Sequence, residues 1–208
     1  MKRIIKNKEP KEFIDWKSNW ETPPDWTTFD GKPIKQLVKR TLLEEQGYIC
    51  CFCENRVMMD HGHIAHLLDR KQHPELVLEY GNILYSCPEN PKKEPQTCGH
   101  AQKNQTLPIS PLDEDCENHF IYNGETGEIL PRKNSNKFNE ANETIRILNL
   151  NGSKVLREKR LAIYQETKNN KSELTSNEFE IWLNHILNRN TENKFIPFWT
   201  TIKYAAQT

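Results

Sequence analysis

The sequence predicts an α+β protein with a small zinc-stapled centre and helices on both sides of it. Three observations support this prediction. Five of the six cysteines, two of them in a Cys-x-x-Cys pair, fall between residues 50 and 98. Short runs rich in β-branched and aromatic residues surround them, and stretches with helical periodicity lie towards both ends. A chain of 208 residues suits one domain or one domain with an appendage.

Residues 1–47 are predicted to form an N-terminal helical segment. Pro10 suits the first turn of a helix, which has no partner for a backbone N–H. The apolar residues after it follow at helical spacing: Phe13, Trp16 and Trp20. A second amphipathic helix contains Leu37 and Leu42 and ends at Gly47, because glycine readily takes the left-handed conformation that closes a helix.

Residues 48–131 are predicted to be the core, which holds the short strands. The β-rich runs are Tyr48–Phe52, Gly81–Ser86 and His119–Tyr122. Turn dipeptides at Asn123-Gly124 and Thr126-Gly127 predict a small hairpin over residues 120–130.

Residues 132–208 are predicted to be a C-terminal helical region. The clearest helix runs from Thr175 to Asn190, where Thr175 and Glu178 make a capping box. One side of this helix carries an apolar stripe, which is more often core packing than a partner surface. The aromatic tail is either core or docking surface: Phe195, Phe198, Trp199 and Tyr204.

The charge is balanced over the whole chain but not along it. Lys/Arg and Asp/Glu number 29 each. Residues 51–131 hold 6 basic and 13 acidic side chains, whereas residues 132–208 hold 13 and 8. An acidic centre argues against tight binding to nucleic acid without help, because such binding depends on Lys and Arg.

The composition is that of a cytoplasmic protein. Hydrophobic residues make up 35% of the chain, and the mean hydropathy is −0.86. No apolar stretch approaches the ~18 residues that a membrane-spanning helix needs, and the basic N-terminus lacks the apolar core of a signal peptide. Cysteines in such a chain indicate metal ligands or reduced thiols before disulfides.

The cysteines predict a structural zinc site. Cys50 and Cys53 form a knuckle that can place both thiolates on one ion, and Cys87 and Cys98 would complete a tetrahedral set. With four protein ligands, no position is open for water, so the zinc would stabilise the fold rather than catalyse. The alternative is a set of reduced buried cysteines. We assign no role to the two others, Cys51 and Cys116.

The motifs around these cysteines resemble the His-Asn-His (HNH) endonuclease family, which builds a ββα-metal site. The matching segments, in order, are GYICCFCENR, GHIAHLLDRKQHPE, EYGNILYSC, TCGHAQKN, PLDEDCENHF and LNLNG. The order and content are most similar to the HNH nuclease subunit of the bacterial Septu anti-phage system, a protein type that also occurs with retrons. The resemblance extends over residues 10–160.

The resemblance implies roles for individual residues. His66 falls at the general base, Asn82 at the middle Asn that holds this histidine, and His100 at the final metal ligand. A catalytic Mg²⁺ or Mn²⁺ is implied beside the structural Zn²⁺. Lys103 and Asn104 follow on the expected helix, where they could contact phosphate. Each of these residues, taken alone, is also compatible with an ordinary surface side chain.

Position 65 departs from the family pattern. The residue before the general base is normally Asp or Glu, an oxygen ligand for the catalytic metal, and here it is Ala65. Of the other candidates, Asp69 would need a sharp bend of the chain, and His63 is a softer ligand. Either the protein has lost catalysis and kept a scaffold role, or alanine deliberately replaces a glutamate. The intact remainder of the motif favours the second explanation.

The resemblance also implies partners. Relatives of this type act with an ABC-like ATPase, and this chain contains no G-x-x-x-x-G-K-[ST] motif of its own. DNA, phage DNA above all, is the expected substrate, with RNA as a rival. A non-catalytic zinc-knuckle adaptor is the alternative from another class. Arg157, Lys159 and Arg160 could contact phosphate, or they could form an ordinary solvated helix face.

Overall fold

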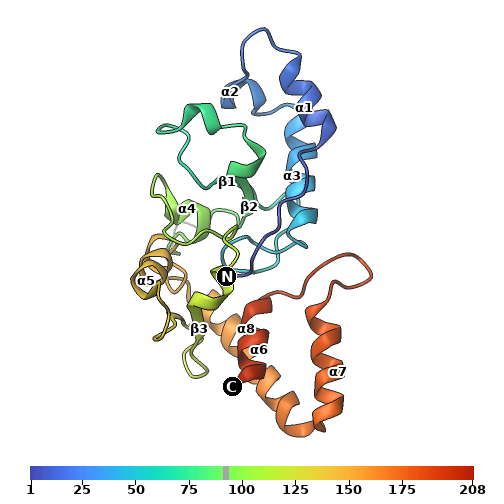
Figure 1. Ribbon diagram of the computed structural model, residues 1–208, viewed down its shortest axis with the longest axis vertical. Coiled ribbons are helices and arrows are strands. Elements are labelled where there is room, and N and C mark those ends of the chain that lie inside the picture. The colour runs from blue at the N-terminus through green and yellow to red at the C-terminus, as the bar shows by residue number, and fades with distance from the viewer. Residues whose placement is uncertain (91–93) are drawn as a thin grey trace.

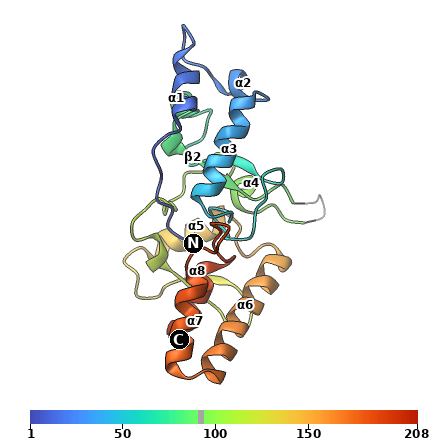
Figure 2. The ribbon, with the colours of Figure 1, turned by 90° about the vertical axis from the view of Figure 1, so that its right-hand side faces the viewer.

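The computed structural model describes residues 1–90 and 94–208 of the chain. The molecule is elongated, with the N-terminal helices at one end, the strands and clustered cysteines in the middle, and the last three helices at the other end (Figure 1, Figure 2). Its regular elements are helices and two small sheets, so the α+β class is confirmed.

The N-terminal end consists of three helices, α1 (Lys11–Ser18), α2 (Trp26–Phe29) and α3 (Pro33–Glu45). Phe13 of α1 and Phe29 of α2 are fully buried against each other, with ring centroids 5.6 Å apart. The short α2 was not foreseen from the sequence. It forms because the Asp25 carboxylate accepts a hydrogen bond from the Thr28 N–H, 2.7 Å away, and so caps the helix.

The middle of the molecule contains an antiparallel pair of strands and a short helix. Strand β1 (His63–His66) pairs with β2 (Ile83–Ser86), so that His63 lies opposite Ser86 and His66 opposite Ile83. Helix α4 (Cys98–Gln102) packs beside them (Figure 1). The expected strand at residues 48–52 is wrong: the chain turns there, and only an isolated bridge from Ile49 to Arg56 forms.

A second hairpin follows, of β3 (Phe120–Tyr122) and β4 (Ile129–Pro131), which confirms the hairpin prediction. Helix α5 (Phe138–Ile147) packs on β4. One-turn helices occur at Pro74–Leu76, Tyr80–Asn82 and Cys116–His119.

The C-terminal end contains α6 (Lys154–Glu173), α7 (Ser176–Leu187) and α8 (Trp199–Gln207). The predicted capping box at the start of α7 is present, with Thr175 and Glu178 each bonded to the other's backbone. Phe179 is the buried member of the apolar stripe on α7, with 8% of its surface exposed, and Ile181 outside the stripe is 63% exposed.

Both alternatives that the sequence left open for Arg160, a phosphate contact and a solvated helix face, are wrong. Arg160 is 2% exposed, and its guanidinium donates hydrogen bonds to the carbonyls of Gly127 and Leu150. The helical period explains this placement, because Arg160 lies one turn beyond the buried Leu156, whereas Lys159 points to solvent.

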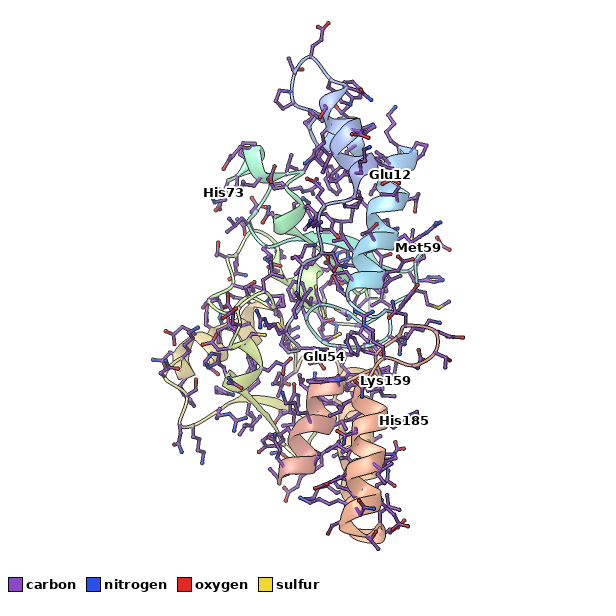
Figure 3. The ribbon with its side chains drawn as sticks, turned by 45° about the vertical axis from the view of Figure 1, so that its right-hand side comes forward. Glu12, Glu54, Met59, His73, Lys159 and His185 are labelled. Carbon is purple, nitrogen blue, oxygen red and sulfur yellow. The ribbon has the colours of Figure 1, made fainter. Side chains whose placement is uncertain are left out.

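The cysteine knuckle is tied to the last helix. The buried carboxylate of Glu54 accepts hydrogen bonds from the backbone N–H of Thr200, 2.8 Å away, and from its hydroxyl. Figure 3 shows Glu54 at the point where the C-terminal helices meet the rest of the molecule. Phe198 at the start of α8 is 3% exposed, so this part of the aromatic tail belongs to the core.

Within the described residues, no helix is both long enough and apolar enough to span a membrane.

Candidate functional site

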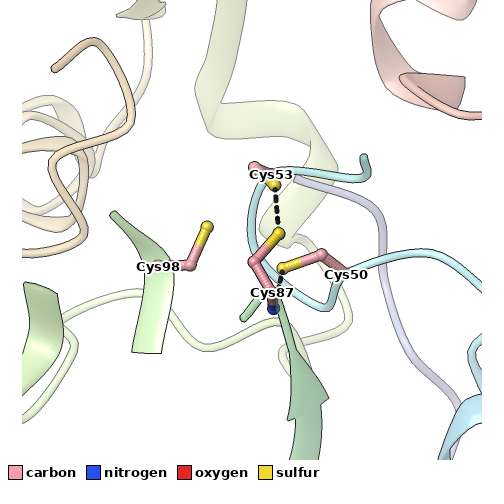
Figure 4. Close-up of side chains that lie close together, drawn as sticks. All are labelled: Cys50, Cys53, Cys87 and Cys98. Atoms are coloured by element: carbon pink, nitrogen blue, oxygen red, sulfur yellow. Dashed lines mark hydrogen bonds between the residues drawn. The ribbon is translucent and has the colours of Figure 1, made fainter. Parts of the chain in front are cut away.

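The structure brings together the four cysteines expected to bind zinc. The Sγ atoms of Cys50, Cys53, Cys87 and Cys98 lie within 4.8 Å of one another, and all four residues are buried (Figure 4). With Zn–S bonds of about 2.3 Å, neighbouring sulfurs of a tetrahedral zinc site are about 3.8 Å apart. The donor set therefore fits a structural zinc ion.

The acid–base chemistry of these thiols also favours a cation. Burial raises the pKa of Cys50, but hydrogen bonds from the surrounding thiols outweigh burial and lower that pKa overall. Hydrogen bonding with Cys50, together with burial, raises the pKa of Cys87 and of Cys98. Because such a cluster alone keeps few thiolates, a divalent ion bound by all four sulfurs would release the remaining protons.

The other two cysteines lie outside this cluster. Burial raises the pKa of the Cys51 thiol, and it raises that of Cys116 to about 12. Both thiols are therefore protonated at neutral pH and unreactive, in keeping with the absence of an assigned role.

A second site lies where β1, the turn after it and α4 meet. A cleft of about 280 Å³ is lined there by polar side chains from all three elements. Three of them were singled out in the sequence: His66, His100 and Lys103. His63 and Asp69 were lesser candidates, and Arg70 was not considered.

One ring nitrogen of His66 is hydrogen-bonded to the backbone, and the other is not. Its Nε2 lies 3.0 Å from the carbonyl oxygen of Val77. A carbonyl only accepts hydrogen bonds, so Nε2 carries the proton and Nδ1 keeps a free lone pair. Burial is the main cause that lowers the pKa of His66 to about 4. The imidazole is therefore neutral at pH 7 and can accept a proton at Nδ1.

Asn82 acts on the turn that follows His66 rather than on the imidazole. Its Oδ1 accepts a hydrogen bond from the Leu68 N–H at 2.8 Å, and its Nδ2 donates to the carbonyls of Leu68 and Leu76. The residue is 7% exposed. It fixes the chain immediately after β1 and thereby the position of His66.

His63 and His100 form a pair across the cleft, with ring centroids 4.0 Å apart. The Nδ1 of His63 lies 2.6 Å from the Cys87 carbonyl and must donate to it, so its Nε2 is free to bind a metal. Burial, then the charge of His100, lowers the pKa of His63 to about 4. The sequence ranked His63 as a secondary candidate because imidazole is a softer ligand than a carboxylate. The structure shows that His63 adjoins His100.

Gly99 allows α4 to approach this pair. A Cβ atom at Gly99 would lie 2.6 Å from Nε2 of His63 and 3.1 Å from the Cβ of Ala65. His63 and Ala65 therefore point to the same side of β1, towards α4, as alternation along a strand requires. A longer side chain at position 65 would extend towards the imidazole pair.

The cleft does not contain a complete set of metal ligands. Among the described residues, the only group of three or more His, Cys, Asp or Glu side chains close enough to share an ion is the four-cysteine cluster. Ala65 supplies no ligand atom. The chain bends at Leu67 and Leu68 directly after β1, and Asp69 lines the cleft, but its Oδ1 accepts hydrogen bonds from the backbone of Lys71 and Gln72.

Lys103 and Asn104 do not lie on the helix, which ends at Gln102. Lys103 follows it with a positive φ of 54°. Both side chains are exposed, and Lys103 lines the cleft. The sequence did not single out Gln102, which is buried and donates to the carbonyls of His66 and Leu67, joining the end of α4 to the end of β1.

Comparison with known proteins identifies a relative of this chain. No family model matches the chain. Over 179 residues it is 30% identical to a protein of Vibrio cholerae serotype O1 biovar El Tor named "Retron Vc95 putative HNH endonuclease". The alignment covers 81% of this chain and 86% of that protein.

Proposed function

The chain belongs to the HNH endonuclease family, and on that premise we propose that it is the metal-dependent endonuclease subunit of an anti-phage complex. It hydrolyses phosphodiester bonds of nucleic acid, with phage DNA as the main substrate, and acts with an ABC-like ATPase. The reduced thiols of the knuckle suit action in the cytoplasm.

One observation carries this proposal: β1, paired with β2, and α4 bring His66 and the His63–His100 pair around a single cleft, and Asn82 fixes the turn after β1. These elements form the ββα-metal core in our proposal. The cysteine cluster adjoins this core, because Cys87 follows β2 and Cys98 begins α4. A structural zinc ion bound by these cysteines would therefore hold the last strand and the helix of the core in place.

In this proposal His66 is the general base. Its Nδ1 takes a proton from a water molecule, which attacks the phosphorus atom, while Nε2 stays bonded to Val77. Gln102 and Asn82 fix the backbone directly after the imidazole, from the His66 carbonyl to the Leu68 N–H. Rigid support of this kind keeps the base in line with the reacting atoms.

His63 and His100 are the residues that would hold the catalytic metal. The metal supplies positive charge to the phosphate and to the leaving oxygen. Two imidazoles suit Zn²⁺ or Mn²⁺ better than Mg²⁺, which prefers oxygen ligands. The residues present fit a divalent ion only in part, because Ala65 occupies the position of the expected carboxylate.

Ala65 also favours a second candidate function. Without the carboxylate, the chain would act as a zinc-knuckle adaptor that binds nucleic acid or the ATPase and does not cut. The ATPase itself must be a separate polypeptide in either case, since this chain lacks the G-x-x-x-x-G-K-[ST] motif.

The Ala65→Glu substitution tests the proposal. With the partner ATPase present, we expect the Ala65→Glu protein to cleave labelled duplex DNA with Mg²⁺ or Mn²⁺, and the unsubstituted chain to lack most of this activity. Adding His66→Ala should lower cleavage by about 10²- to 10⁴-fold while metal binding persists, because the base and the ligands have separate tasks.

Two results would contradict this account. If the unsubstituted chain cuts as well as the Ala65→Glu protein, residue 65 is not a ligand. If the Ala65→Glu protein stays inert with its complete partner set, the adaptor hypothesis is favoured. Competition by single-stranded RNA separates an RNA-directed nuclease from a DNA-directed one.

A further inference from the structure

We propose that Arg70, supported by Trp26, binds a phosphate of the nucleic-acid strand in the cleft beside His66. The N-terminal helical segment would then form part of the nucleic-acid binding site rather than a separate support. This inference rests on the proposed function for its substrate, a nucleic acid, but not on cleavage.

The guanidinium of Arg70 has all its donors free. Arg70 lines the same cleft as His66 and His100. Across residues 1–90 and 94–208, its side chain makes no hydrogen bond to protein and has no carboxylate within 4.0 Å. The neighbouring Asp69 carboxylate accepts hydrogen bonds from the next turn of backbone instead. An arginine fork with unused donors in a cleft suits bidentate binding of phosphate.

Trp26 holds this guanidinium in place. The Cζ atom of Arg70 lies 4.6 Å from the centroid of the Trp26 ring, a distance at which cation–π attraction operates. The same ring meets His66 edge-on, with centroids 5.0 Å apart and an interplanar angle of 72°. One aromatic side chain therefore positions both the proposed base and the proposed phosphate ligand.

A second cation belongs to this group. The Nζ atom of Lys35 lies 5.2 Å from the Trp26 ring, but Lys35 is ion-paired with Asp30. Among the described residues, Arg70 is thus the unpaired cation beside Trp26. Lys103 lines the same cleft. Two cations in the same cleft as His66 fit a strand of phosphates better than an acidic peptide or a metal.

DNA binding tests this proposal without requiring cleavage. The full chain is titrated against a fluorescein-labelled DNA duplex and a single strand, by fluorescence anisotropy, from about 20 mM to about 200 mM salt. We expect Arg70→Ala to weaken binding about fivefold to tenfold at low salt and to reduce the slope of log affinity against log salt by about 0.9, the loss of one phosphate contact. Lys133→Ala, which removes an exposed charge outside the cleft, is the matched control and should leave both quantities unchanged.

Variants of Trp26 test whether its ring positions the Arg70 guanidinium, apart from any effect on folding. Trp26→Ala should reproduce the Arg70→Ala loss, and the double variant should bind no worse than either single one, because both changes remove the same contact. Trp26→Phe keeps a ring under the guanidinium and should retain most of the affinity. Thermal unfolding of each variant identifies any that fail to fold.

The outcomes are distinct from those for the nuclease proposal. If Ala65→Glu stays inert but Arg70→Ala still loses affinity and salt dependence, catalysis is refuted and the phosphate contact stands. If Arg70→Ala binds like the unsubstituted chain, the inference is wrong. It is also wrong if the unsubstituted chain binds neither DNA nor RNA at about 20 mM salt, where phosphate contacts are strongest.

Discussion

At the scale of single residues, the approach of α4 to β1 depends on the missing side chain of Gly99. A methyl group there would overlap Nε2 of His63, whose ring cannot retreat freely because Nδ1 is bonded to the Cys87 carbonyl. His63 also contacts His100 on the same side. The geometry of the imidazole pair is therefore sensitive to a change of one carbon atom.

We accordingly expect Gly99→Ala to lower the affinity of the cleft for Mn²⁺ or Zn²⁺ by at least about tenfold, a cost typical of disturbing the support of a metal ligand. Isothermal titration after the cysteine site has been filled with zinc would measure it. The matched control is Gly81→Ala, since a Cβ at Gly81 meets nothing within 4 Å. Unchanged affinity in the Gly99→Ala protein would remove His63 from the ligand set.

The six cysteines divide into two classes at the same scale. Replacing Cys50, Cys53, Cys87 or Cys98 by serine should unfold the middle of the molecule, because structural zinc contributes on the order of 10 kcal/mol of coupled folding free energy. Cys51→Ser and Cys116→Ser should cost only about 1 kcal/mol, since each places one hydroxyl among buried groups. Zinc content and thermal unfolding would show the difference. Equal effects at all six positions would contradict the zinc assignment.

At the scale of elements, α6 is anchored by a buried arginine. Arg160 is bonded to the carbonyls of Gly127 and Leu150 and to the Asn151 side chain, at 2.7, 3.1 and 3.3 Å. These acceptors come from the turn of the second hairpin and from the segment before α6. Arg160 therefore joins three parts of the chain.

Arg160→Met should lower the free energy of unfolding by about 2–4 kcal/mol, because it leaves buried carbonyls without donors. Lys159→Met, at the exposed neighbouring position, should change stability by less than about 0.5 kcal/mol. Urea unfolding of the two variants provides the comparison. If both variants lose a similarly small free energy of unfolding, water or another group replaces the guanidinium as hydrogen-bond donor.

At the scale of the whole molecule, the two ends of the chain meet through Glu117. Its carboxylate accepts a hydrogen bond from the Arg3 N–H at 3.0 Å and pairs with Lys203 of α8 at 2.8 Å. Burial would raise the pKa of Glu117, but these two bonds outweigh it and the pKa in the folded protein is lowered.

The unfolded chain therefore takes up this proton at higher pH than the folded one. The stabilisation is present above the unfolded pKa of about 4.3 and is lost as the pH falls through the folded value. Glu117→Gln should be less stable than the unsubstituted protein in urea at pH 6–7, and the gap should narrow below about pH 4.3. Loss of zinc in acid affects both proteins alike. A gap that stays constant with pH would show that the charge of Glu117 is not the cause.

The charge distribution makes a further prediction at this scale. Residues 51–131, which contain the cleft, hold 13 acidic against 6 basic side chains. The chain alone should therefore bind DNA weakly and with strong salt dependence, and it should gain affinity when the ATPase partner supplies a second contact. Anisotropy titrations with and without the partner measure the DNA affinity of the chain alone and the gain in affinity that the partner brings. Tight binding by the isolated chain at physiological salt would rule this out.

The three predicted segments, 1–47, 48–131 and 132–208, remain a prediction about folding units. Contacts cross both borders, since Trp26 meets His66 and Thr200 meets Glu54. Each end of the chain therefore supports the middle of the molecule.

The sequence by itself determined features that depend on residues a few positions apart in the chain. The capping box at Thr175, the hairpin at residues 120–131 and the end of α3 near Gly47 were all predicted, because caps and turns need particular side chains within a few positions. The clustering of Cys50, Cys53, Cys87 and Cys98 was predicted from their spacing, because a Cys-x-x-Cys pair and two later cysteines can share one metal ion.

Only the tertiary structure decided which distant residues share an environment. That His63 adjoins His100, that Arg160 is buried while Lys159 is exposed, and that Trp26 lies against both His66 and Arg70 all depend on how elements pack. A local pattern limits which side of a strand or helix a residue occupies. It does not specify what that side faces, because the partner comes from tens of residues away and is selected by the packing of the whole core.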